Sequence, residues 1–144
     1  MNLIIKILEN KDLAKMKAVL EDDNIIFDIK KLKSFINDDK SVGFIAQVDD
    51  EVVGFAYGYK LLRPDGKTMF HVYSIGILST YQNHGIGTQL MECIVGFAKN
   101  NKCSEIFIIT EKTNPRACHV YEKTDGVNEH ADEIVYVYDL EKND

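Results

Sequence analysis

Hydrophobic and polar positions change their period along this chain, and each change marks an element. A Leu- and Ile-rich run over residues 2–8 predicts a first strand. Helical spacing follows twice. Asp12 is the expected cap of the first helix, and the second helix is expected from Ile29 to Ile36. The apolar face of the first helix is predicted to consist of Leu13, Met16, Val19 and Leu20.

Strand-like patterns dominate the next third of the chain. Residues 42–48 and 52–62 flank an acidic turn at 49–51, which predicts a hairpin. A fourth strand is expected over residues 69–77.

Helical spacing returns from Ile86 to Ala98. A fifth strand is expected over residues 104–110, apolar on both faces as a central strand is. Asn114 followed by Pro115 opens a short last helix, and residues 133–140 are predicted to close the chain as a strand.

The predicted order, β-α-α-β-β-β-α-β-α-β, is typical of a mixed α/β domain. Its first half is antiparallel, and a strand–helix–strand crossover follows near residue 85. No repeat, low-complexity tract or linker interrupts residues 1–144, and their 45% hydrophobic content is enough for one core. We therefore expect a single domain.

The composition of the chain favours some classes of binding partner over others. The chain carries 17 Lys and Arg against 23 Asp and Glu, a formal net charge of −6. Such a charge disfavours nucleic acid and favours cationic small molecules or basic peptides, although it is also an ordinary means of solubility. Lys6 interrupts the first apolar run, so we expect no membrane span and a cytoplasmic protein. Three cysteines without CxxC spacing argue against a disulfide framework or a metal site.

Gly85 and Gly87 lie where the fourth strand passes into a helix. The first amide groups of a helix lack intrahelical partners and carry partial positive charge, so glycines there let a phosphate approach. The alternative is that the pair only permits a tight strand-to-helix turn.

Two familiar phosphate loops do not fit this stretch. A Walker loop ends in Gly-Lys-Ser/Thr, whereas Gly87 is followed directly by Thr88. A dinucleotide fingerprint needs a third small residue where this chain has Leu90, and it normally follows the first strand of a parallel unit.

The stretch Gln82-Asn83-His84-Gly85-Ile86-Gly87, after a strand ending at Ile77, resembles the pyrophosphate motif of the GNAT superfamily of N-acetyltransferases. The resemblance extends roughly from residue 44 to the last predicted strand. It implies a mixed central sheet with a bulged fourth strand, for which Gly76 is suited, and acetyl-coenzyme A as the acetyl donor. The cofactor-binding positions that it implies are Ile75, Gly76, Ile77, Gln82, Asn83, His84, Gly85, Ile86, Gly87, Thr88 and Asn114.

The same resemblance suggests catalytic roles. Tyr121 lies seven residues beyond Asn114, where the family commonly places a tyrosine that protonates the departing thiolate. Asn114 would reach the pantetheine arm or cap the last helix. Glu111 is our candidate general base; His71, Tyr73 and Asp139 are the other candidates. His84 and His119 are interpreted as a variable loop position and a solvent-facing residue.

Within the superfamily the nearest likeness is to the aminoglycoside 3-N-acetyltransferases, which have similarly short chains and a Tyr-rich fourth strand. Those enzymes carry an aspartate after the strand tyrosine, where this chain has Ser74, so a charged contact to a drug ammonium is lost. The acidic stretches, Glu21-Asp22-Asp23 among them, are expected to be solvated.

The expected function is acetyl transfer from acetyl-coenzyme A to a primary amine of a small molecule, such as an aminoglycoside or polyamine. Acceptor-side residues are predicted to be Tyr73, Ser74 and Asp139. The alternatives are a non-catalytic coenzyme A-binding sensor and a peptide N-terminal acetyltransferase. Homodimers are common among relatives, and no stretch of this sequence marks an interface.

Overall fold

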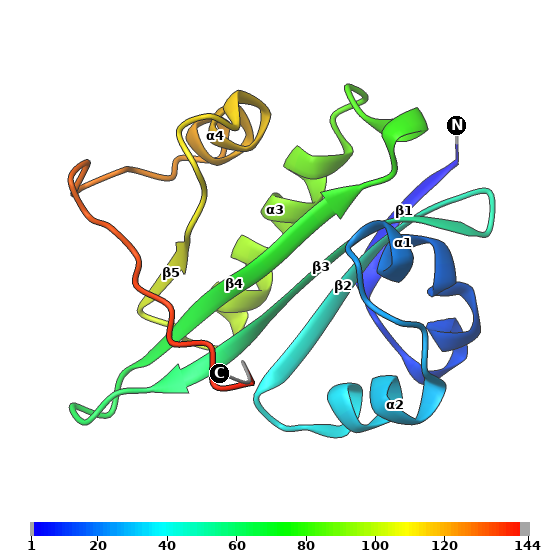
Figure 1. The fold of residues 1–144 in the computed structure, drawn as a ribbon, viewed down its shortest axis with the longest axis horizontal. Coiled ribbons are helices and arrows are strands. Elements are labelled where there is room, and N and C mark those ends of the chain that lie inside the picture. The colour runs from blue at the N-terminus through cyan, green and yellow to red at the C-terminus, as the bar shows by residue number, and fades with distance from the viewer. Residues whose placement is uncertain (1, 142–144) are drawn as a thin grey trace.

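One five-stranded sheet organises the chain, which the computed structural model describes from residue 2 to residue 141 (Figure 1). The strands lie in the sheet in their order along the chain. Neighbours are antiparallel as far as the fourth strand, and the fifth is parallel to the fourth. The strands are β1 (Leu3–Ile7), β2 (Ser41–Val48), β3 (Glu51–Leu62), β4 (Thr68–Ile77) and β5 (Glu105–Ile108).

Helices cover both faces of this sheet. One face carries the 3-10 helix η1 (Asn10–Lys15), α1 (Lys17–Asp22) and α2 (Ile29–Asn37). The other face carries α3 (Ile86–Asn100), which contacts all five strands, and α4 (Pro115–Lys123) packs on α3. A second 3-10 helix, η2 (Ser79–Tyr81), leads from β4 towards α3. The mixed α/β fold expected from the sequence is thus confirmed.

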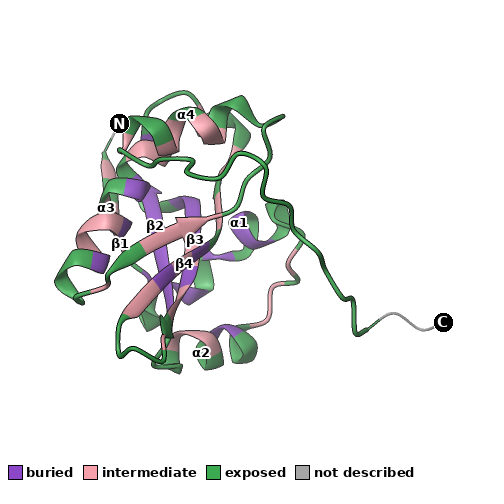
Figure 2. Cartoon of the chain, turned by 90° about the vertical axis from the view of Figure 1, so that its left-hand side faces the viewer, coloured by how far each residue is buried: buried purple, intermediate pink, exposed green. Residues whose placement is uncertain are grey.

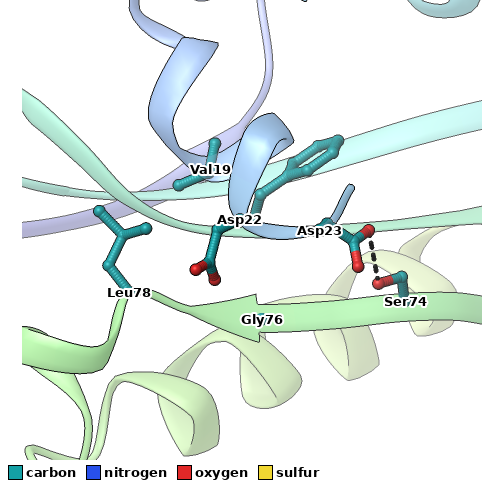
Figure 3. Close-up of a pocket in the computed structure, with 7 residues that line it drawn as sticks. Val19, Asp22, Asp23, Ser74, Gly76 and Leu78 are labelled. Atoms are coloured by element: carbon teal, nitrogen blue, oxygen red, sulfur yellow. Dashed lines mark hydrogen bonds between the residues drawn. The ribbon is translucent and has the colours of Figure 1, made fainter. Parts of the chain in front are cut away.

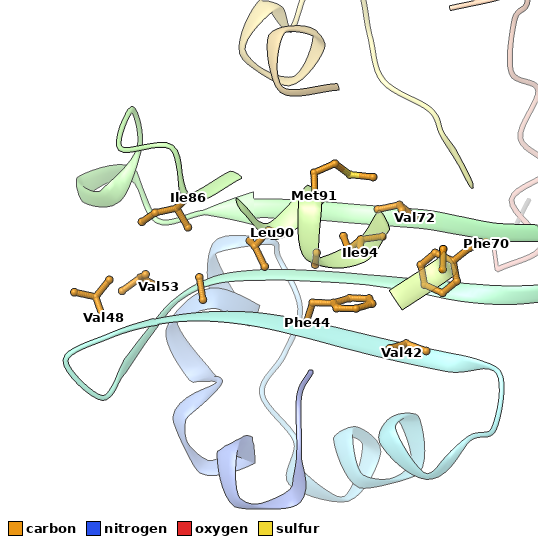
Figure 4. Close-up of a cluster of buried hydrophobic side chains, with 13 residues drawn as sticks. Val42, Phe44, Val48, Val53, Phe70, Val72, Ile86, Leu90, Met91 and Ile94 are labelled. Atoms are coloured by element: carbon orange, nitrogen blue, oxygen red, sulfur yellow. The ribbon is translucent and has the colours of Figure 1, made fainter. Parts of the chain in front are cut away.

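Two hydrophobic clusters hold these layers together. Successive side chains of a strand point to opposite faces, so neighbouring residues of β2 serve different clusters. Phe44 packs with Leu90 and Ile94 of α3 (Figure 4), whereas Ile45 packs in the cluster of α1 that contains Leu20. Buried residues accordingly gather on the central strands (Figure 2). The sheet lies between the two clusters and carries the loops at its ends.

The first helical region begins differently from the prediction. Glu9 is the N-cap of η1, and Asp12 is a buried residue inside that helix, 2% exposed. Its carboxylate accepts a hydrogen bond from the Glu9 amide at 3.0 Å and pairs with Lys6 Nζ at 2.9 Å. The prediction of Asp12 as a cap was wrong, because a cation on the preceding strand draws the carboxylate inward.

Strand β4 is bulged as expected, but the bulge lies at Tyr73. The register with β3 passes over Tyr73, whereas Gly76 pairs regularly with Phe55. Opposite the bulge, a Cβ at Gly58 would collide with the carbonyl oxygen of His71. A glycine on β3 therefore allows the bulge, and Gly76 is not needed for it.

The predicted closing strand is absent from the described part of the chain. Residues 133–140 form neither helix nor strand, and Tyr138 and Leu140 are 85% and 92% exposed (Figure 2). Within the described residues β5 pairs only with β4, so it is a four-residue edge strand and not the central strand that its apolar faces indicated. An alternating pattern makes a segment suited to a sheet, but a strand forms only where a neighbouring edge supplies its hydrogen bonds.

No helix within residues 2–141 has the length and the apolar run that crossing a bilayer requires.

Candidate functional site

The loop between β4 and α3 is tied to the end of the strand. Gln82 Nε2 donates a hydrogen bond to the carbonyl oxygen of Ile77 at 2.9 Å. Asn83 and Gly85 have positive φ angles of 66° and 78°, and Gly85 is the N-cap of α3. Left-handed backbone is inexpensive only for glycine and tolerable for asparagine. The local sequence therefore turns the chain sharply from the strand end into the helix.

The first turn of α3 offers free amide groups. Its first backbone hydrogen bond runs from the Gln89 amide to the Gly85 carbonyl at 3.1 Å, so the amides at positions 86–88 have no acceptor within the helix. The first turn contains no acidic residue to neutralise the helix dipole. A Cβ built at Gly85 would meet no atom within 4 Å, so the space above the loop is open. These features fit a bound pyrophosphate.

Beside this loop, β4 has an unpaired edge. β4 pairs with β3 as far as Ile77, but its pairing with β5 ends at Val72. From residue 73 to residue 77 the outer edge of β4 therefore has no neighbouring strand in the described chain. The predicted Ile75-Gly76-Ile77 segment lies here, and a Cβ at Gly76 would meet nothing within 4 Å. The Leu78 amide donates to the carbonyl oxygen of Val53 on β3, so the amides of Ile77 and Ile75, which alternate with it, face the open edge and are available to the carbonyl group of a bound molecule.

A cavity of about 30 Å³ adjoins this part of β4 (Figure 3). The Ser74 hydroxyl donates a hydrogen bond to Asp23 Oδ2 at 3.2 Å, and the carboxylate of Asp22 points from the end of α1 towards β4. The space suits one water-sized group, such as a primary ammonium. We name it the acid cavity; it is lined by Val19, Asp22, Asp23, Phe55, Ser74, Gly76 and Leu78.

Asp22 and Asp23 are the residues that sequence reasoning missed. Both are exposed, as was expected of an acidic stretch, but the fold also brings Asp23 to Ser74 from 51 positions away. One local signal existed. Asp22 ends α1 and Asp23 is its C-cap, where acidic side chains oppose the helix dipole and do not stabilise the helix. The structure thus places a carboxylate, that of the α1 C-cap Asp23, beside Ser74.

Aromatic side chains of β3 and β4 stack on one another beside the acid cavity. The ring of Tyr57 stacks on Phe55 at 5.3 Å and on Tyr73 at 5.6 Å, and Phe35 of α2 meets it edge-on at 5.8 Å. Burial, and then the charge of Asp23, raises the pKa of Tyr57 to about 12. A second cavity of about 210 Å³, the aromatic groove, is lined by Leu20, Ile25, Ile26, Asp28, Lys31, Leu32, Phe35, Phe55, Tyr57 and Tyr59.

Helix α4 places Tyr121 and Asn114. Asn114 Oδ1 accepts a hydrogen bond from the Ala117 amide at 3.2 Å. This side chain therefore caps the helix, which is one of the two roles expected from the sequence. Burial, followed by the charge of Cys118, raises the pKa of Tyr121 to about 12. A Cβ at Gly87 would lie 3.5 Å from Val120 Cγ2, so α4 stands directly beside the glycine loop.

Other candidates lie apart from these cavities. Glu111 is exposed on the loop after β5 and accepts a hydrogen bond from Thr113 Oγ1 at 3.2 Å. Asp139 lies in the exposed C-terminal segment, where it accepts a hydrogen bond from the Glu141 amide at 3.0 Å, and not on a strand. Neither lines the acid cavity or the aromatic groove. His84 and His119 are both exposed. Residues 2–141 contain no cluster of three or more His, Cys, Asp or Glu suited to a metal ion.

The glycine loop, the open strand edge and the mixed sheet match one known family. The model of the acetyltransferase (GNAT) family matches residues 6–126. The chain therefore belongs to this family, as the glycine motif indicated. An N-alpha-acetyltransferase from Sulfurisphaera tokodaii is 29% identical over an alignment of 114 residues, and the alignment covers 74% of this chain. This chain spans only 66% of that relative's length.

Solved structures share the fold. An aminoglycoside acetyltransferase from an uncultured soil metagenomic sample, in complex with sisomicin, has a TM-score of 0.79 at 24% identity and 94% coverage of both chains. The aminoglycoside N-acetyltransferase AAC(6')-Iy, in complex with CoA, has a TM-score of 0.77 at 16% identity and covers 96% of this chain and 95% of its own. Aminoglycoside acetyltransferases are thus among its structural neighbours, consistent with the likeness seen in the sequence.

Proposed function

We propose that this protein transfers an acetyl group from acetyl-coenzyme A to a primary amine. One observation carries the proposal: the free amides of α3 and the unpaired edge of β4 meet at Ile77, where Gln82 ties the loop to the strand. A pyrophosphate group held at α3 would leave the rest of the donor free to extend along β4. The CoA complex of a protein with the same fold supports this assignment.

Different residues are assigned to donor binding, to stabilisation of the acetyl oxygen and to positioning of Tyr121. When bound, acetyl-coenzyme A supplies an acetyl group activated as a thioester. The α3 amides of residues 86–88 hold its phosphates, and the backbone near Gly76 donates a hydrogen bond to the acetyl oxygen, where negative charge develops. In the transfer a C–N bond forms and the C–S bond breaks, while the nitrogen loses one proton and the sulfur gains one. Asn114 fixes the start of α4 and thereby positions Tyr121.

Tyr121 is the proposed donor to the leaving sulfur. Its raised pKa, about 12, keeps the hydroxyl protonated through the neutral range. An ordinary thiol has a pKa of about 8.5, so full proton transfer from Tyr121 to a free thiolate would be unfavourable. The hydroxyl therefore acts chiefly as a hydrogen-bond donor to the charge that develops on sulfur, and the proton lost by the amine balances the reaction. Glu111 stays a prediction as the base that takes that proton.

A second acceptor class has its own support. The matched relative from Sulfurisphaera tokodaii is named an N-alpha-acetyltransferase, and two of the structural neighbours are named aminoglycoside acetyltransferases. We therefore propose short peptides beside amino sugars and polyamines as candidate acceptors.

The test combines binding and turnover. Acetyl-coenzyme A affinity is measured by titration calorimetry, and free coenzyme A release is followed with aminoglycosides, spermidine and short peptides. We expect Tyr121→Phe to lower kcat by about tenfold to a hundredfold with little change in acetyl-coenzyme A affinity. His119→Gln, on an exposed position of the same helix, is the matched control. Full turnover in Tyr121→Phe would remove the assigned role, and binding without turnover on any amine would favour a coenzyme A sensor.

A further inference from the structure

Building on the proposed function, we infer that the acceptor is a primary amine carried next to a bulky apolar group, such as the α-amine of a chain that begins with Leu or Phe. The ammonium occupies the acid cavity, and the apolar group occupies the aromatic groove. This combination distinguishes the acceptor from a polyhydroxylated amino sugar or a linear polyamine.

The two cavities are adjoining parts of one surface. Phe55 lines both of them. Tyr57, which lines the groove, stacks on Phe55 and lies close enough to Asp23 for that carboxylate to raise its pKa. A molecule that occupies both cavities would therefore contact Phe55 in each of them.

The acid cavity is built for one small cation. Its lining contains two carboxylates, those of Asp22 and Asp23, and no basic side chain. Neither carboxylate forms an ion pair within residues 2–141. The hydroxyl of Ser74 donates to Asp23 and so orients that carboxylate beside β4. The volume of about 30 Å³ suits an ammonium but not a sugar ring. An amine held here lies against Gly76, beside the β4 edge proposed to bind the acetyl oxygen.

The aromatic groove has the opposite chemistry. Its walls are aliphatic and aromatic apart from the tyrosine hydroxyls, Lys31 and Asp28, and the Asp28 carboxylate already accepts hydrogen bonds from two α2 amides. Its volume of about 210 Å³ exceeds the roughly 150 Å³ of a cavity that binds benzene. Ile26 lines the groove and is 87% exposed, so an apolar substituent would cover it. Sugar hydroxyls would lose water here with few hydrogen-bond partners.

The experiment measures acceptor preference. The kcat/KM for coenzyme A release is compared among tripeptides beginning with Leu, Phe or Gly, with 2-phenylethylamine, kanamycin and spermidine beside them. We expect the Leu and Phe peptides to exceed the Gly peptide at least tenfold. If 2-phenylethylamine has the same kcat/KM as the Phe peptide, the site recognises only the amine and its apolar group. If its kcat/KM is much lower, the site also recognises the peptide backbone.

Two variants locate the preference. Ile26→Ser, at an exposed position that the fold does not need, should reduce the Phe-over-Gly ratio severalfold and leave acetyl-coenzyme A affinity unchanged. Asp23→Asn should raise KM at least tenfold for every amine that is accepted. Glu21→Gln is the matched control, because Glu21 pairs with Lys17 at 2.7 Å and lines neither cavity.

The outcomes separate the two levels of the proposal. Turnover of kanamycin or spermidine above the apolar amines, or equal turnover of the Gly and Phe peptides, would overturn the inferred acceptor and leave acetyl transfer standing. An unchanged Phe-over-Gly ratio in Ile26→Ser would also overturn it. Absence of turnover with every amine, in a protein that binds acetyl-coenzyme A, would instead overturn the proposed function.

Discussion

Gly87 offers a substitution that separates folding from donor binding. It is the second residue of α3, and a Cβ there would meet only Val120 Cγ2, at an ordinary contact distance of 3.5 Å. Replacing a helical glycine by a better helix former gains up to about 1 kcal/mol. A glutamate in the first turn gains about 0.3–1 kcal/mol more from the helix dipole. We therefore expect Gly87→Glu to fold with equal or higher stability, its Tm raised by about 2–5 °C.

The same carboxylate should expel the donor. It would stand at the α3 amides that are proposed to hold the pyrophosphate. Two unit charges about 5 Å apart repel by roughly 3 kcal/mol at an effective dielectric constant of about 20. Since each 1.4 kcal/mol corresponds to about tenfold in affinity, acetyl-coenzyme A should bind at least a hundredfold more weakly.

Calorimetric titration and thermal unfolding, run on the same preparations, provide the assay. Gly87→Gln has the same length without the charge, so its smaller loss measures the steric part. Gly96→Glu adds the same charge farther along α3, where a Cβ meets nothing within 4 Å, and should bind the donor normally. Unchanged affinity in Gly87→Glu would refute the pyrophosphate assignment, and a large loss of stability would refute the packing argument.

Three further outcomes follow from the fold. Asp12→Asn leaves Lys6 without its buried partner and should lower the free energy of unfolding in urea by about 2–4 kcal/mol; a change below about 0.5 kcal/mol would contradict the ion pair. Burial lowers the pKa of His71 in the folded protein, which therefore favours the neutral imidazole. The free energy of unfolding is therefore unaffected by this group above the ordinary histidine pKa of 6.5, and it decreases as the pH falls below that value. His71→Phe, which can keep the stack on Phe107, should remove that pH dependence in urea titrations. Amides of residues 134–140 should exchange with solvent at the rate of an unstructured peptide, and protection would instead reveal the strand that the alternating pattern predicted.

Local chemistry was enough to predict the form of the loop that is proposed to bind the donor. Apolar periodicity located the helices and strands as far as residue 123, and Asn114-Pro115 marked the start of α4. The glycine loop was recognised because positive φ at Gly85 and free amides in the next turn are properties of a few consecutive residues. Signals of this kind act over one or two turns, and so they are readable in the chain itself.

Only the tertiary structure decided the surface that is proposed to bind the acceptor. Asp23 meets Ser74 across 51 positions, and the bulge of β4 falls at Tyr73, beside a glycine on the neighbouring strand. The segment over residues 133–140 has the alternating side-chain pattern of a β-strand but does not pair with a neighbouring strand. In each case the outcome depends on which distant groups the sheet brings within hydrogen-bonding distance. A carboxylate or a strand edge has a role only when its partner is present, and that partner is chosen by the packing of the whole domain.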